Sequence, residues 1–193
     1  GDRPLTAFAI GGEIDSARLQ PPAEDVELSV SGSSVSLTPS EPVFLENRRL
    51  VVNVEGTQYE SDPLDLLYDP RAPTVRYTSP APGAWQGEGS TVRVEVAENL
   101  GGVDVSRAVG DEAFTALRAG EDGSYEFFVP PPEEDGSVLV RVRAEDRAGN
   151  ATVTPLHLNF DTTRPQLAVI SPAEGDQVNG RITVAGRADD GGA

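Results

Sequence analysis

An internal repeat constrains the fold of this chain more than any other feature of its sequence. Asp69-Pro-Arg-Ala-Pro73 recurs as Asp161-Thr-Thr-Arg-Pro165, an offset of 92 residues from Asp69 to Asp161. At the same offset, Ser79-Pro-Ala-Pro-Gly83 recurs as Ser171-Pro-Ala-Glu-Gly175. A period near 90 residues is too long for a solenoid repeat and is typical of a single β-sandwich module of roughly 100 residues.

The repeat divides the chain into three copies. We expect a shorter, diverged copy at residues 1–69, a complete copy at 70–161 and the start of a third at 162–193. The third copy has room for two strands, too few to bury a core of its own. We therefore expect it to be incomplete and the chain to be a piece of a longer array.

The apolar residues alternate with the two-residue period of β-strands. In the complete copy, valines at 92, 94 and 96 alternate with Arg93 and Glu95. The 20 Gly and 16 Pro supply turns, and no stretch shows a sustained helical period. The predicted strands of this copy are 74–78, 91–97, 103–109, 113–118, 125–129, 138–144 and a last strand ending at Phe160. The predicted fold class is all-β, with tandem antiparallel sandwiches in an extended array.

The other two copies carry the same kind of pattern. In the first copy we expect strands at 5–10, 14–19, 26–30, 34–37, 50–55 and 64–68. In the third copy we expect a strand at Arg181–Gly186, the counterpart of the strand that starts at Thr91. Without partners in its own copy, this strand could accept a neighbouring chain's strand and so drive self-assembly. The alternative is that the array simply continues.

Composition excludes several classes of function. The chain has no Cys, one His (His157) and 15 basic residues, all of them Arg, against 32 acidic residues. Disulfide frameworks, thiolate zinc sites and multi-histidine metal centres are therefore ruled out. A net charge of -17 makes nucleic acid an unfavourable partner. No apolar run approaches the ~18 residues of a membrane span, so we expect no membrane insertion.

Two turn motifs resemble those of a known family. Ala144-Glu-Asp-Arg-Ala-Gly-Asn150 and the Asp161-to-Pro165 linker are similar to the turns and linkers of tandem bacterial Ig-like domains. The resemblance implies Ig-like sandwiches in a secreted or surface-anchored bacterial protein, acting as an adhesin, stalk or filament. It implies an extracellular or cell-surface location, with neighbouring modules as the first partners and an unidentified protein or glycan ligand. The first copy departs from the pattern at Glu55-Gly-Thr-Gln58.

The resemblance also implies a candidate metal, because some related arrays bind calcium at module junctions. Calcium prefers six to eight oxygen ligands. The resemblance maps such sites onto Asp146, Asn150 and Asp161, with Asp69 at the earlier junction. The alternative is that these Asp and Asn side chains cap tight turns through their own backbone. No other cofactor is expected.

Nothing in the sequence predicts catalysis. Glu133-Glu-Asp135 and Glu121-Asp122 are adjacent acids on loops, without the ~5–9.5 Å separation across a cleft that glycosidases use. We therefore expect a structural or adhesive module array and no enzyme. The alternative is an accessory module of a secreted enzyme, either a spacer or a carbohydrate binder that stacks sugars on Trp85, Tyr77 and Tyr59.

Overall fold

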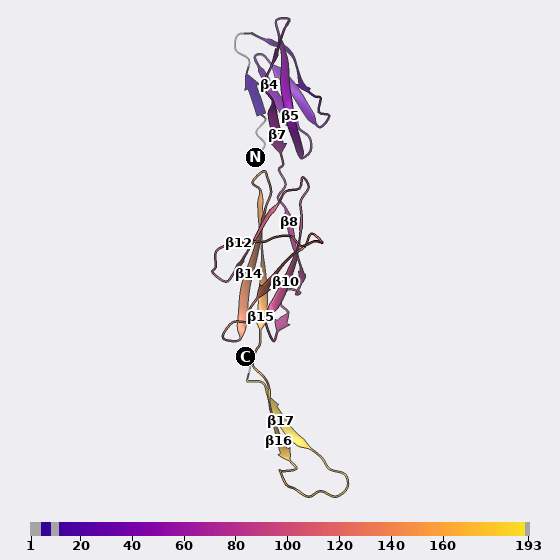
Figure 1. Cartoon of the computed structure of the whole chain (residues 1–193), viewed down its shortest axis with the longest axis vertical. Coiled ribbons are helices and arrows are strands. Elements are labelled where there is room, and N and C mark those ends of the chain that lie inside the picture. The colour runs from indigo at the N-terminus through magenta and orange to yellow at the C-terminus, as the bar shows by residue number, and fades with distance from the viewer. Residues whose placement is uncertain (1–4, 9–11, 192–193) are drawn as a thin grey trace. The chain divides into compact units, whose positions relative to one another are not determined.

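The structure is a computed structural model that describes residues 5–8 and 12–191. Every regular element in this part of the chain is a β-strand, so the predicted all-β class is confirmed (Figure 1). The contacts group the chain into two compact units. Unit 1 is Gly1–Thr74, Ala97–Asp104 and Ala144–Thr152, and unit 2 is Val75–Val96, Val105–Arg143 and Val153–Ala193. The copy boundaries expected at 69/70 and 161/162 stay predictions.

The first copy folds as a sandwich of small antiparallel sheets. One sheet has the order β1-β4-β3, and the other has the order β2-β5-β6, with β7 also paired to β5. Their bounds are β1 Leu5–Phe8, β2 Ile14–Gln20, β3 Val26–Ser31, β4 Ser34–Pro39, β5 Val43–Val54, β6 Thr57–Glu60 and β7 Leu64–Tyr68. Of the strand expected at 5–10, residues 9 and 10 lie outside the described residues.

The long strand β5 organises the second of these sheets, because β2, β6 and β7 all pair with it. Its first part pairs with β7, and its second part pairs with β2 and β6, after a register shift between Leu45 and Arg48. Asn47, within the shift, has a positive φ of 54°, a conformation that Asn tolerates better than most residues. The buried core draws on both sheets: Ile14, Leu19, Val26, Val35, Leu37, Val43, Leu50 and Leu66.

The complete copy is a larger sandwich of two sheets. The three-stranded sheet has the order β13-β10-β8, and the five-stranded sheet has the order β12-β11-β14-β15-β9 (Figure 1). Their bounds are β8 Thr74–Ser79, β9 Trp85–Gln86, β10 Ser90–Ala97, β11 Asp104–Val109, β12 Thr115–Ala116, β13 Tyr125–Val129, β14 Gly136–Glu145 and β15 Ala151–Phe160. The strand expected at 113–118 is wrong in length, because only two of its residues pair with β11.

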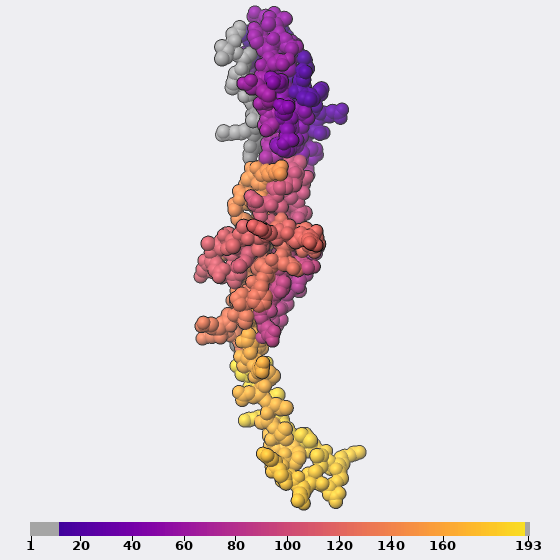
Figure 2. Space-filling view, in the orientation of Figure 1, coloured from indigo at the N-terminus to yellow at the C-terminus, as the bar shows by residue number. Residues whose placement is uncertain are grey.

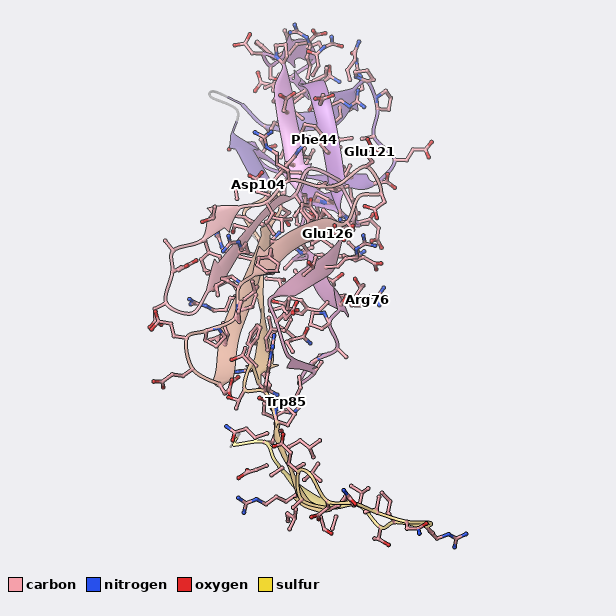
Figure 3. The ribbon with its side chains drawn as sticks, turned by 60° about the horizontal axis from the view of Figure 1, so that its bottom comes forward. Phe44, Arg76, Trp85, Asp104, Glu121 and Glu126 are labelled. Carbon is pink, nitrogen blue, oxygen red and sulfur yellow. The ribbon has the colours of Figure 1, made fainter. Side chains whose placement is uncertain are left out.

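The predicted alternation sets the core of this copy. Val92 and Val94 are fully buried, whereas Arg93 and Glu95 face solvent. The outer face of the three-stranded sheet carries cross-strand ion pairs, Arg76 with Glu95 and Arg93 with Glu126. Figure 3 labels Arg76 and Glu126. Charges along strands of this kind discourage edge-to-edge aggregation.

Trp85 lies in a short strand, β9, between the predicted strands 74–78 and 91–97. Strand β9 pairs in parallel with the end of β15, where Asn159 stands opposite Trp85. The indole is 66% exposed and lies at the surface (Figure 3). Trp85 therefore adds little to the core, although it is the only Trp of the chain.

The third copy contributes an antiparallel pair, β16 (Gln166–Ser171) and β17 (Ala185–Asp189). The strand expected at Arg181–Gly186 is misplaced, since only its last two residues belong to β17. The counterparts of residues 181–184 in the complete copy pair with β13. Within the described residues, the third copy has no strand in that role, so this segment stays irregular and its apolar side chains Ile182 and Val184 are exposed. Figure 2 draws the third copy in light orange to yellow.

Candidate functional site

Three carboxylates gather at one point in unit 1. Asp69, Glu98 and Asp146 each place a carboxylate oxygen within 4.8 Å of the other two. Asp69 and Asp146 are buried, with 8% and 7% of their surface exposed, and Glu98 is half-buried. Each follows directly after a strand, namely β7, β10 and β14. We call these three residues the carboxylate cluster.

The Asp69 carboxylate is held by two neutral donors. Its Oδ1 accepts a hydrogen bond of 3.0 Å from the backbone N–H of Arg71, which closes a turn at the start of the linker. Its Oδ2 accepts a hydrogen bond of 3.0 Å from the side-chain amide of Asn99. Neither donor carries a charge, so both bonds orient the carboxylate without neutralising it.

Asp146 and Asn150 form the turn between β14 and β15. The Asp146 N–H donates to the Asn150 carbonyl at 3.0 Å, and Asp146 Oδ1 accepts from the Asn150 N–H at 2.8 Å. The Asn150 Nδ2 group donates to Asp146 Oδ2 at 2.8 Å and to the Asp69 carbonyl at 2.7 Å. Asn150 therefore connects two members of the cluster as a hydrogen-bond donor.

Glu98 supplies the unsatisfied atom of the cluster. Its Oε1 accepts hydrogen bonds from the N–H groups of Asn99 and Leu100, at 2.8 and 3.1 Å. Its Oε2 is buried and has no hydrogen-bond partner among the residues that the structure describes. A buried carboxylate oxygen without a partner is costly, and the cost is greater beside two other carboxylates.

The cluster matches the ligand chemistry of a hard cation. Calcium binds carboxylate and carbonyl oxygens at 2.3–2.6 Å, so two ligands on opposite sides of the ion are about 5 Å apart. Oxygens within 4.8 Å of one another fit around one such ion. A positive charge at this point would satisfy the unpartnered Oε2 of Glu98.

The four residues expected from the sequence fall in different places. Asp69 and Asp146 belong to the cluster, and Asn150 lies beside it as a donor rather than an oxygen ligand. Asp161 belongs to unit 2, where its Oδ1 accepts from the Thr163 N–H at 3.2 Å. The turn-capping alternative thus describes Asp161 and also part of the bonding of Asp69.

Glu98 was missed by the sequence reasoning. It stands directly after β10 and opens the turn that leads to β11. The available signal was an acidic residue directly after a strand, the position that Asp69 and Asp146 also occupy.

Asn150→Ala should destabilise this region by about 1–3 kcal/mol, because the Asp69 carbonyl and Asp146 Oδ2 each lose their donor. Urea unfolding with an unchanged slope measures the loss. Asn159→Ala is the matched control, since Asn159 Nδ2 makes a single 3.2 Å bond to the Gly83 carbonyl. Equal effects of the two variants would contradict the role given to Asn150.

Comparisons with known proteins return similar solved structures only. No family model matches the chain, and no curated protein matches it in sequence. Fibronectin(III)-like modules of CbhA from Clostridium thermocellum match at 16% identity and a TM-score of 0.38, covering 82% of this chain and 84% of that one.

Two further structures match over about half of their own length. A putative membrane-anchored protein from Corynebacterium diphtheriae matches at 12% identity and a TM-score of 0.38, covering 86% of this chain and 52% of that one. The adhesin InvE of Yersinia pseudotuberculosis matches at 17% identity and a TM-score of 0.28, covering 81% and 49%. At such values only the chain's own residues bear on its function.

The structure also bears on two further expectations, one about membrane spans and one about sugar binding. Among residues 5–8 and 12–191, no helix is long and apolar enough to cross a membrane. The aromatic residues proposed as a sugar platform lie on three different strands. Tyr59 is in β6 of the first copy, Trp85 is in β9, and Tyr77 in β8 donates its hydroxyl to the Thr154 carbonyl at 2.7 Å. Burial raises the pKa of Tyr77 to about 12.

Proposed function

We propose that this chain is a segment of an extracellular bacterial array of Ig-like modules with a structural or adhesive role and no catalytic activity. The observation that carries the proposal is the repeated linker. Asp69 and Asp161 each follow the last strand of a copy, and each carboxylate accepts the N–H two residues further on. Short linkers with the same local geometry, each ending in Pro, favour an extended stalk, because Pro restricts the chain on both sides.

Solution scattering of the whole chain tests this function. One compact body of this length would have a radius of gyration of about 16 Å. We expect a value well above that, with a distance distribution that has a long tail. A radius near the compact value would contradict a stalk or filament. A glycan array with reproducible hits would instead favour the accessory carbohydrate-binding alternative, for which the aromatic residues on three different strands give no support.

We also propose that the carboxylate cluster binds calcium. Asp69, Glu98 and Asp146 would hold the ion, and Asn150 would fix two of them through its donated hydrogen bonds. The support is the burial of the two aspartates and the unpartnered Oε2 of Glu98. The ion would supply positive charge that neutral donors cannot, and would fasten the linker residue Asp69 to the turns that carry Glu98 and Asp146.

Self-assembly through residues 181–186 remains the proposal for a partner. The apolar side chains Ile182 and Val184 are exposed, whereas their counterparts Val92 and Val94 are fully buried. Residues 181–184 also lack a strand partner within the described part of the chain. An added strand with alternate apolar residues, like β13, would satisfy both. A concentration-dependent mass in analytical ultracentrifugation would support this proposal, and a monomer at all concentrations would oppose it.

A further inference from the structure

Each of the two linkers makes a contact of the same kind, which the repeated sequence motifs do not indicate. Each copy has a loop before the strand that pairs with its last strand: residues 40–42 before β5, and residues 130–135 before β14. Each loop carries an acidic side chain that reaches the linker. These side chains are Glu41 and Asp135, and both lie in the same compact unit as the linker they contact.

At the first linker the contact is an ion pair. The Arg71 guanidinium donates to Glu41 Oε2 at 2.8 Å, and the two side chains are 59% and 65% exposed. Arg71 is the third linker residue, counted from Asp69. Exposed ion pairs of this kind are weak and are screened by salt.

At the second linker the same position is held by neutral donors. Asp135 Oδ1 accepts from the Thr162 N–H at 2.6 Å and from the Thr162 hydroxyl at 2.8 Å. Asp135 Oδ2 accepts from the hydroxyl of Thr163, the third residue counted from Asp161. Both oxygens of one carboxylate are thus engaged by two consecutive residues, and hydrogen bonds to a charged acceptor are the stronger kind.

The electrostatics agree with this geometry. The pKa of Asp135 lies below its usual value, because the Thr163 hydroxyl, the Thr162 N–H and the Thr162 hydroxyl all stabilise the charged form. The Asp161 turn constrains the same segment from the other side, since its Oδ1 holds the Thr163 N–H. The first residues after β15 are therefore fixed by two carboxylates.

We propose that Glu41 and Asp135 are linker latches, side chains by which each copy fixes the path of the chain that leaves it. The latch at Glu41 is an ion pair, which breaks at high salt. The latch at Asp135 relies on neutral donors, so its hydrogen bonds persist at high salt. The two linkers therefore differ in stiffness as ionic strength rises, although their turns are alike. This inference does not rest on calcium binding.

Amide hydrogen exchange of the whole chain, followed by NMR in the presence of a chelator, tests the proposal. Asp135→Ala should speed exchange of the Thr162 amide on the order of tenfold, because that N–H loses a charged acceptor. Glu134→Ala is the matched control, since Glu134 is an exposed neighbour in the same loop. Unfolding of the complete copy, followed by Trp85 fluorescence, should be the same in both variants.

The two latches can be distinguished by their response to salt. Raising NaCl from about 0.1 M to about 1 M shortens the screening length from about 10 Å to about 3 Å. Relaxation of the backbone amides should then show Arg71 and Ala72 becoming more mobile in the wild type, and Glu41→Gln should remove that response. Residues 162–163 should not respond. Unchanged Thr162 exchange in Asp135→Ala, or equal acceleration in Glu134→Ala, would overturn the proposal.

Discussion

Replacing Phe160 by Ala should destabilise the complete copy by about 3–5 kcal/mol, the usual cost of removing a fully buried aromatic side chain. Phe160 is the last residue of β15, has no exposed surface, and closes the core that Val92, Val94 and Leu158 also line. Phe160 is the last residue before the linker. The interpretation of this copy as a sandwich with its own core therefore depends on the burial of Phe160.

Trp85 fluorescence is the natural readout, since it is the only Trp in the chain and lies in the complete copy. Urea unfolding should show a lower midpoint with an unchanged slope. Phe128→Ala is the matched control, because Phe128 is 59% exposed and its loss should cost far less. A cost below about 1 kcal/mol for Phe160→Ala would mean that Phe160 does not close a packed core.

Calcium should produce the second large effect. A ligand that binds only the folded state at 100 times its dissociation constant adds about 2.7 kcal/mol of stability. For a domain of 60–100 residues this corresponds to a rise of roughly 10 °C or more in the unfolding midpoint. Scanning calorimetry of the whole chain, with calcium and then with a chelator, measures the shift.

Magnesium provides the selectivity control for that experiment. It demands a smaller, near-octahedral shell and gives up its water reluctantly, so an equal concentration should shift the midpoint much less. An unfolding midpoint that is the same with calcium, magnesium and chelator would contradict a metal site. Asp69 and Asp146 would then be turn-forming residues only.

Most strands of the complete copy, and its core, followed from two-residue alternation, which is a local property of the chain. Val92 and Val94 are buried as their alternation predicts, and Phe160 is buried at the end of the last predicted strand. The prediction of a strand at 181–186 was wrong, because a strand also needs a neighbouring strand to pair with. Thr91–Val94 pair with β13, whereas the matching residues of the third copy have no such strand within the described residues.

The candidate site was only partly predictable, for a different physical reason. Its three acids are 29 and 48 residues apart in the sequence, from Asp69 to Glu98 and from Glu98 to Asp146. Motif reasoning found Asp69 and Asp146 because linker and turn motifs contain them. The pairing of strands determines which turns lie together, and the lack of a partner for Glu98 Oε2 can be seen only once the side chains are placed.

The most direct test of the cation site is a calorimetric titration of calcium into the wild-type chain and into Glu98→Gln, with Glu121→Gln as an exposed control. The Gln variant keeps an Oε1 acceptor for the Asn99 and Leu100 amides but removes the unpartnered carboxylate charge. We predict binding to the wild type and to Glu121→Gln, and weak or no binding to Glu98→Gln. With chelator present, Glu98→Gln should be at least as stable as the wild type, because repulsion within the cluster is relieved. Equal calcium binding by all three chains, or none by the wild type, would contradict the assignment.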